Sequence, residues 1–109
     1  MTTFAENLAG LPGIEHLQCI ELSVQEVLQE RIPNQPGKQG SLRVYYALHQ
    51  RFGELHAEAA RVGLALFAEH TEDARQHPGK HPNIDRLLAV IEQDLCMQIR
   101  PIVNAGEST

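Results

Sequence analysis

Residues 14–22 read Ile-Glu-His-Leu-Gln-Cys-Ile-Glu-Leu, a stretch in which apolar and polar residues nearly alternate. A period of two places successive side chains on opposite faces of an extended chain, so this pattern is typical of a strand with one buried face. We therefore expect a strand from Gly13 to Ser23. This strand decides the fold class, because most of the remaining sequence favours helices.

Residues 24–32 admit two interpretations. Ser23, with Glu26 three positions later, fits a capping box at the start of a helix, whereas Val27 and Ile32 fit a strand that returns along the first one. We favour the strand, which gives an N-terminal β-hairpin. Isolated two-stranded hairpins are marginally stable, so this hairpin must rest on helices or pair with a second copy. We therefore predict a homodimer.

Residues 33–41, Pro-Asn-Gln-Pro-Gly-Lys-Gln-Gly-Ser, consist largely of turn-forming residues and mark an internal boundary. They are not a phosphate-binding P-loop, because that motif requires Lys and then Ser or Thr directly after its second glycine. Lys38 is interpreted as a solvated turn residue, and Ser41 is expected to cap the next helix. Apolar residues at three- and four-residue spacing then predict a helix over residues 42–52, with Gly53 as its C-cap.

A longer helical pattern covers residues 54–76. Its alanines and Gly63 give this helix a small-residue surface on which a neighbouring element can approach closely. A competing interpretation takes residues 62–68 as a buried strand and starts a new helix at Thr71. We favour the single helix, with an apolar side that consists of Leu55, Ala59, Val62, Gly63, Leu66 and Phe67.

The third helix is predicted over residues 83–98, after Pro82 and before Pro101. Its apolar stripe suits packing against the central helix, and it suits a dimer contact equally well. The fold class is therefore α+β, in which a short N-terminal β-hairpin packs on three helices. The alternative is an all-α helical bundle.

Residues 1–109 are expected to form a single domain with frayed ends at residues 1–12 and 103–109. A short helical turn from Phe4 to Leu8 is left open. The hydrophobic content of 42% and the charged content of 21% are those of a globular protein.

Histidine and carboxylate side chains extend the apolar side of the central helix. His70, Asp73 and His77 follow one another at three- and four-residue spacing, which brings side chains together on a helix surface. Two imidazoles and one carboxylate could hold a divalent transition metal with open positions for water. His81 lies four residues further, across a turn, and is a fourth candidate ligand. Without a metal, a His-Asp pair could act as a general base in a small pocket.

A structural interpretation of the same residues is also available, and we favour it. His77 in a last helical turn complements the helix dipole, Pro78 and Gly79 form a turn, and Pro82 begins the next helix. Helix spacing brings His and Asp together by chance in many proteins. We therefore predict no cofactor, and a divalent metal at His70, Asp73 and His77 is the alternative.

The charge balance and the termini narrow the class of protein. A net charge of −5 disfavours nucleic acid as a partner, including RNA bound through Lys38, Arg43 and Arg51. No apolar stretch is long enough to span a bilayer, and the N-terminus does not have the pattern of a signal peptide. Cys19 and Cys96 have no ligand-like spacing and are expected to be buried thiols in a reducing compartment. These features predict a soluble cytoplasmic protein.

Two segments of the sequence resemble a known family. They run from Asn34 to Tyr45 and from Gly63 to Leu87, and they include Pro-Gly-Lys-His-Pro-Asn-Ile-Asp-Arg-Leu. The family that they resemble is a small bacterial one described as a domain of unknown function, and the resemblance covers about residues 8–91. It implies a soluble bacterial protein, of proteobacterial type, and transfers no catalytic residue.

The sequence therefore predicts a small interaction or accessory protein. The chain has no Gly-x-Ser-x-Gly motif and no cysteine close to a histidine in a catalytic pattern, so an enzyme is the less favoured class. The alternative is a small metal- or ligand-binding protein, including a hydrolase, that uses the His70, Asp73 and His77 face.

Overall fold

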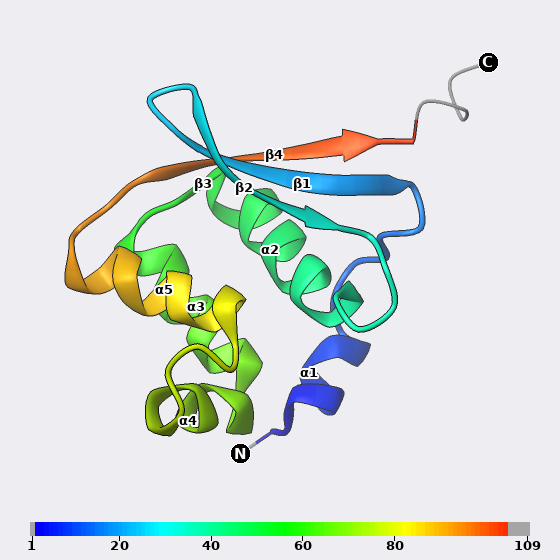
Figure 1. Cartoon of the computed structure of the whole chain (residues 1–109). Coiled ribbons are helices and arrows are strands. Elements are labelled where there is room, and N and C mark those ends of the chain that lie inside the picture. Colours follow the sequence, from blue (N-terminus) through cyan, green and yellow to red (C-terminus); the bar gives the residue numbers. More distant parts are fainter. Residues whose placement is uncertain (1, 105–109) are drawn as a thin grey trace.

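A four-stranded antiparallel sheet with helices on one side makes up the fold in the computed structural model, which describes residues 2–104 (Figure 1). The strand order is β2-β1-β4-β3. The strands are β1 (Leu17–Val24), β2 (Val27–Pro33), β3 (Glu54–Leu55) and β4 (Met97–Val103). The helices are α1 (Phe4–Ala9), α2 (Gln39–Phe52), α3 (Ala57–Phe67), α4 (Glu69–Gln76) and α5 (Pro82–Glu92). The fold class is α+β, as predicted, and the all-α alternative is wrong.

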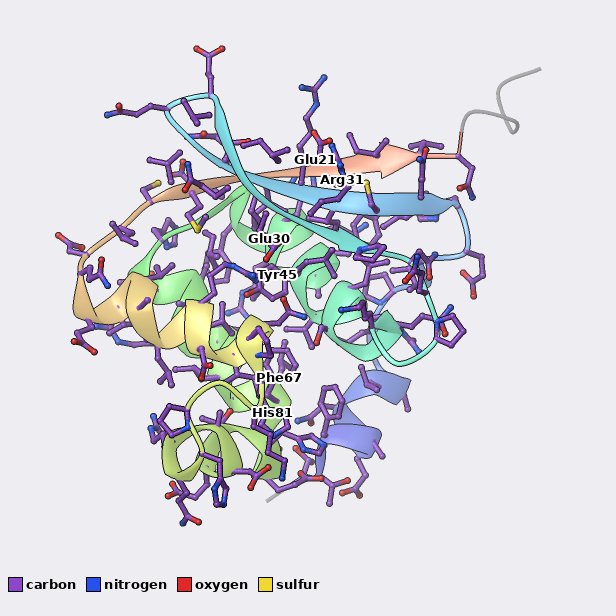
Figure 2. All side chains as sticks on the ribbon, in the orientation of Figure 1. Glu21, Glu30, Arg31, Tyr45, Phe67 and His81 are labelled. Atoms are coloured by element: carbon purple, nitrogen blue, oxygen red, sulfur yellow. The ribbon has the colours of Figure 1, made fainter. Side chains whose placement is uncertain are left out.

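The N-terminal β-hairpin is confirmed, and so is the interpretation of residues 24–32 as a returning strand. β1 and β2 pair antiparallel, with Ile20 opposite Ile32 on the face that the helices cover. On the opposite face, Arg31 donates to Glu21 at 2.8 Å, and Figure 2 shows this pair above the sheet. The alternation that predicted β1 therefore separates a buried face from a solvated one.

The C-terminal strand β4 corrects the prediction of a helix over residues 83–98. α5 ends at Glu92, and Asp94 has a positive φ of 54°, which turns the chain out of the helix. Met97 and Ile99 are buried whereas Gln98 and Arg100 are exposed, so this segment has the period of a strand. β4 pairs with β1 and β3 and thus supports the hairpin. The argument that led to a homodimer no longer applies, and the homodimer itself stays a prediction.

The predicted helix over residues 54–76 is wrong, because the structure divides it into β3, α3 and α4. The division between the two helices lies at Ala68, which has a positive φ of 52°. Thr71 follows, and its hydroxyl donates to the carbonyl oxygen of Leu64 at 2.6 Å, an oxygen left without a helical partner by the break. The competing interpretation was right that a second helix follows, although α4 begins at Glu69 and not at Thr71. Residues 62–67 are helical and not a strand.

The buried face of α3 is also rotated from the predicted one. Its buried residues are Ala59, Ala60, Gly63, Leu64 and Phe67, and Val62 and Leu66 are only partly buried. Gly63 provides the close approach that its size predicted: a Cβ there would lie 2.8 Å from a Leu87 methyl and 3.0 Å from a Leu48 methyl. α3 therefore packs between α2 and α5.

The start of α2 differs from the prediction, and its end agrees with it. The helix begins at Gln39 with Lys38 as the N-cap residue, so Ser41 lies inside the first turn and does not cap it. Gly53 is the C-cap, with φ of 82° and its N–H bound to the carbonyl oxygen of His49. Side chains of α2 lie against the sheet and include Leu42, Val44, Tyr45 and Leu48.

Residues 4–9 and 103, which were predicted to lie in frayed ends, belong to regular elements. Thr3 and Glu6 form a capping box at the start of α1, which the Asn7 side-chain amide ties to the carbonyl oxygen of Leu66 at 2.9 Å. Residues 4–9 are therefore helical and not frayed. Val103 belongs to β4, so fraying does not begin there, and residues 105–109 of the predicted frayed end lie outside the described residues.

The two cysteines differ in exposure. Cys19 is buried, as expected, but Cys96 is exposed because it lies in the turn between α5 and β4. Within residues 2–104, no helix has the length and the apolar character that a membrane crossing requires.

Candidate functional site: a cationic pocket at two helix starts

The predicted His and Asp residues come together only in part. Asp73, on α4, accepts a hydrogen bond from Nε2 of His81 at 2.7 Å and one from Nζ of Lys80 at 3.0 Å, both at Oδ2. Nε2 of His77 lies 3.8 Å from Oδ1 of the same carboxylate, which is beyond hydrogen-bond distance. Asp73 therefore holds the segment that precedes α5.

His70 packs against α1, and within residues 2–104 it forms no hydrogen bond or ion pair with Asp73. Its ring meets the edge of the Phe4 ring with centroids 5.0 Å apart, and its centroid lies 5.7 Å from that of His81. In the part of the chain that the structure describes, no group of three His, Cys, Asp or Glu side chains is arranged to hold a metal ion. The turn at Ala68 explains why His70 and Asp73 do not prolong the apolar face of α3, because α4 does not continue the line of α3.

The charge state of Asp73 follows from these contacts. Hydrogen bonds from His81 and Lys80 lower the pKa of Asp73 from 3.8 to about 2. The carboxylate is therefore ionised at neutral pH and acts only as an acceptor.

A pocket of about 520 Å³ lies directly beside this cluster. Its wall comes from α1, from the starts of α2 and α5, from the end of α3 and from α4. Figure 2 shows Phe67 and His81 next to one another in this region. The lining residues are Phe4, Leu8, Phe67, Ile84, His70, His81, Lys38, Lys80, Ser41, Asn83, Gln39, Gly37, Gly40 and Pro82.

The pocket has an unusual charge for this protein. Lys38 and Lys80 are the only two lysines of the sequence, and both line it together with two histidines. No Asp or Glu lines it, although the chain has 14 acidic residues and a net charge of −5. By contrast, a hollow between α3, α4 and α5 has Asp85 and Glu92 in its wall.

Two helix starts add to the positive character of the pocket. Residues 39–41 form the first turn of α2, and Asn83 and Ile84 belong to the first turn of α5. The first N–H groups of a helix have no acceptor within it, and the helix dipole places partial positive charge there. At α5, Pro82 has no N–H and that of Ile84 donates to the carbonyl oxygen of His81 at 3.0 Å, so a bound anion would meet backbone donors chiefly from the first turn of α2.

Packing holds the apolar part of the pocket in place. The rings of Phe4 and Phe67 are stacked with centroids 5.3 Å apart. A Cβ at position 40 would lie 3.0 Å from the Phe4 ring, so Gly40 lets α1 approach the start of α2. The backbone N–H of Phe4 also donates to Glu69 at 2.9 Å, and this bond attaches α1 to α4.

Sequence reasoning missed Lys38, Lys80 and Phe4 as parts of one site. A signal was present in the two lysines, because both occur in the tripeptide Pro-Gly-Lys, at residues 36–38 and 78–80. The two glycines have similar positive φ angles, 87° at Gly37 and 92° at Gly79. Each turn leads into a helix and delivers its lysine to the pocket. That the two turns lie side by side is decided only by the tertiary fold.

The fold and the site define a small α+β protein with a cationic pocket where two helices begin. Residues 4–101 match the family DUF2322, described as an uncharacterized protein conserved in bacteria, and the chain belongs to this family. The predicted resemblance to a bacterial domain of unknown function is thereby confirmed. No curated protein and no solved structure matches the chain.

Proposed function

We propose that this protein is an accessory protein that binds a small anionic ligand in the cationic pocket. The observation that carries the proposal is the gathering of both lysines and two histidines, without a carboxylate, in an acidic chain. The chain has 14 acidic and 9 basic residues, so randomly placed charges would line a hollow with carboxylates more often than with cations. A wall free of carboxylates is therefore a feature that an anionic ligand would require.

The two lysines of the pocket differ in how much of their positive charge is available to a ligand. Lys80 is paired with Asp73, which offsets part of its charge. Lys38 forms no ion pair within residues 2–104, so its ammonium group is available to a ligand. The first turn of α2 lies directly after Lys38, and together they offer an anion a charge and several N–H donors.

The shape of the pocket adds a second property of the ligand. Phe4, Leu8, Phe67 and Ile84 provide an apolar wall beside the cationic rim. A volume of about 520 Å³ lies in the range of small-molecule sites. The ligand is therefore a phosphate ester or a carboxylate attached to a small apolar or aromatic body.

Titration with matched probes tests this proposal. Phenyl phosphate, benzoate and inorganic phosphate distinguish the anionic group from the body, and benzylamine supplies the opposite charge on a similar body. In ¹H–¹⁵N spectra, we expect the anions to shift the amide signals of residues 37–41 and 79–84. Removal of each lysine by Lys38→Gln or Lys80→Gln should weaken binding about tenfold, because a charge-assisted hydrogen bond contributes about 1.5 kcal/mol or more.

The control is a double variant that removes two positive charges elsewhere. Arg61→Gln/Arg100→Gln changes two exposed residues, one on α3 and one on β4, that do not line the pocket. It should bind the anions almost as well as the unmodified protein. Shifts confined to other surfaces, or equal binding of benzylamine, would contradict the proposal.

The proposal gives the predicted accessory role a definite chemical content. It also keeps the alternative of a ligand-binding protein. The ligand is now an anion held by the lysines beside His70 and His81, and no metal is involved. The cytoplasmic location and the homodimer stay predictions.

A further inference from the structure

Two histidines occupy helix N-cap positions and use their rings differently. His56 caps α3, and its Nδ1 accepts a hydrogen bond from the backbone N–H of Ala59 at 3.1 Å. His81 stands at the same position before α5 but makes no capping hydrogen bond with its side chain. Its ring is turned toward Asp73 through Nε2. Within the described residues, Nδ1 of His81 has no hydrogen-bond partner.

Asp73 determines which nitrogen of His81 carries the proton. An ionised carboxylate can only accept, so Nε2 must carry a hydrogen to make the 2.7 Å contact. In the neutral ring, the lone pair then lies on Nδ1. A histidine whose tautomer is fixed by a carboxylate has the arrangement that activated imidazoles share, because the carboxylate also stabilises a positive ring.

His81 contacts Asp73 and also forms part of the pocket wall. His81 lines the pocket whereas Asp73 does not, and the two ring nitrogens lie at different edges of the imidazole. Lys80 precedes His81 directly and lines the same wall. The lysines that would receive the oxygens of a phosphoryl group therefore line the same pocket as His81.

We propose that His81 accepts a phosphoryl group at Nδ1 from a phosphoryl donor bound in the pocket, so that the protein carries phosphohistidine. The inference rests on the proposed anion binding. The donor class is a phosphoramidate, an acyl phosphate or a phosphoanhydride.

The reaction balances with groups already in place. The Nδ1 lone pair forms the new N–P bond while the bond from phosphorus to the leaving group breaks. With phosphoramidate the leaving group is ammonia, which takes the electron pair of the broken bond to nitrogen. Nε2 keeps its proton, so the ring becomes cationic, and Asp73 faces that charge across its 2.7 Å hydrogen bond.

Incubation of the full chain with potassium phosphoramidate tests this inference. We expect the intact mass to increase by one phosphoryl group, which is stable in base and labile in acid, and fragment spectra should place it on His81. His81→Gln should abolish the adduct. Asp73→Asn should slow its formation about tenfold, because the asparagine no longer stabilises the cationic ring. The matched control His56→Gln changes the other N-cap histidine and should leave the rate unchanged.

Binding of inorganic phosphate, measured on the same samples, separates this inference from the proposed function. Phosphate binding without an adduct, or an adduct on His70 or His77 in place of His81, would overturn the inference and leave the anion pocket standing. Absence of phosphate binding at residues 37–41 and 79–84 would overturn the proposed function. Phosphate binding together with an adduct at His81 supports both.

Discussion

At the scale of single residues, Asp73 has the largest structural influence on the site. One carboxylate oxygen binds Lys80 and His81, and this fixes the segment that leads into α5. The backbone N–H of Gly79 donates to Asp85 of α5 at 2.9 Å, so the turn between α4 and α5 is held by a carboxylate from each of the two helices. The positions of Lys80 and His81 in the pocket thus depend on the Asp73 carboxylate, which does not itself line the pocket.

The pH dependence of stability checks the role of Asp73. Folding lowers the pKa of Asp73 from 3.8 to about 2, so its contribution is complete above pH 3.8 and is lost as the pH falls through about 2. Asp73→Asn should therefore lower the free energy of unfolding at pH 7, and its difference from the unmodified protein should shrink toward pH 2. Urea titrations across this range measure the difference.

A neighbouring carboxylate supplies the control. Glu72 is exposed on the same helix, and its closest cation, on Arg75, lies at 3.9 Å. Glu72→Gln should show a smaller change with pH than Asp73→Asn. An equal change of stability with pH in the two variants would contradict the role assigned to the contacts of Asp73 with Lys80 and His81.

At the scale of elements, the break between α3 and α4 decides which residues reach the pocket. Ala68 adopts φ of 52° and ψ of −118°, a backbone conformation that glycine tolerates far better than alanine. The turn points α4 away from the line of α3 and brings His70 against Phe4 of α1. A continuous helix would have prolonged the apolar face of α3 into the His70 and Asp73 face of α4, as the helical wheel predicted.

Glycine at position 68 should stabilise the protein. Such a conformation costs a non-glycine residue about 1 to 3 kcal/mol, and glycine loses about 0.5 to 1 kcal/mol more entropy on folding. Ala68→Gly should therefore raise the free energy of unfolding by about 1 kcal/mol in urea titrations. The control Ala65→Gly makes the same change inside α3 and should lower it by about 0.5 to 1 kcal/mol. A loss of stability in both variants would argue against the strained turn.

At the scale of the whole molecule, one buried network joins the helical layer to the sheet. The Tyr45 hydroxyl, on α2, donates to the carbonyl oxygen of Asn83 at 2.6 Å and accepts from Arg86 at 3.1 Å. Arg86 also reaches Glu30 of β2 at 3.4 Å. Figure 2 shows Tyr45 and Glu30 on the helical side of the sheet. The Tyr45 hydroxyl thereby joins α2 to α5, and Arg86 joins α5 to β2.

Alkaline unfolding tests this network. Burial raises the pKa of Tyr45 to about 12 from 10, so folding favours the neutral phenol; its contribution is complete below pH 10 and is lost as the pH rises toward 12. Tyr45→Phe should lower stability at pH 7 by about 1 to 3 kcal/mol, because Asn83 loses its donor. The variant should then lose less stability than the unmodified protein between pH 10 and 12.

The companion variant Tyr46→Phe separates this effect from a general one. Tyr46 is only partly buried, and its hydroxyl meets the exposed His16 at 3.1 Å. We expect it to change stability at pH 7 by less than Tyr45→Phe does. An equal loss in both variants would contradict the role of the buried network.

Local patterns could be predicted from the sequence where one physical cause dominated. The alternation of residues 14–22 predicted β1, and Gly53 predicted the end of α2, because burial of one face and a positive φ are local requirements. The prediction failed at β4, because its pairing with β1 and β3 is long-range: Met97 and Gln98 were assigned to the end of a helix, and no strand was predicted there. Of the residues that line the pocket, the sequence singled out His70 and His81, as candidate metal ligands, since Lys38 and Phe4 reach it through the fold.

The sequence by itself determined the α+β class, the hairpin, the small-residue surface at Gly63 and membership of a bacterial family. These follow from periodicity, from side-chain size and from extended matching segments. Only the tertiary structure decided that β4 lies between β1 and β3, that α4 turns away at Ala68, and that two Pro-Gly-Lys turns meet at one pocket. The physical reason is that burial of apolar faces against partners distant in sequence outweighs local helical preference. The same burial brings the charges of Lys38 and Lys80, which are 42 residues apart in sequence, into one site.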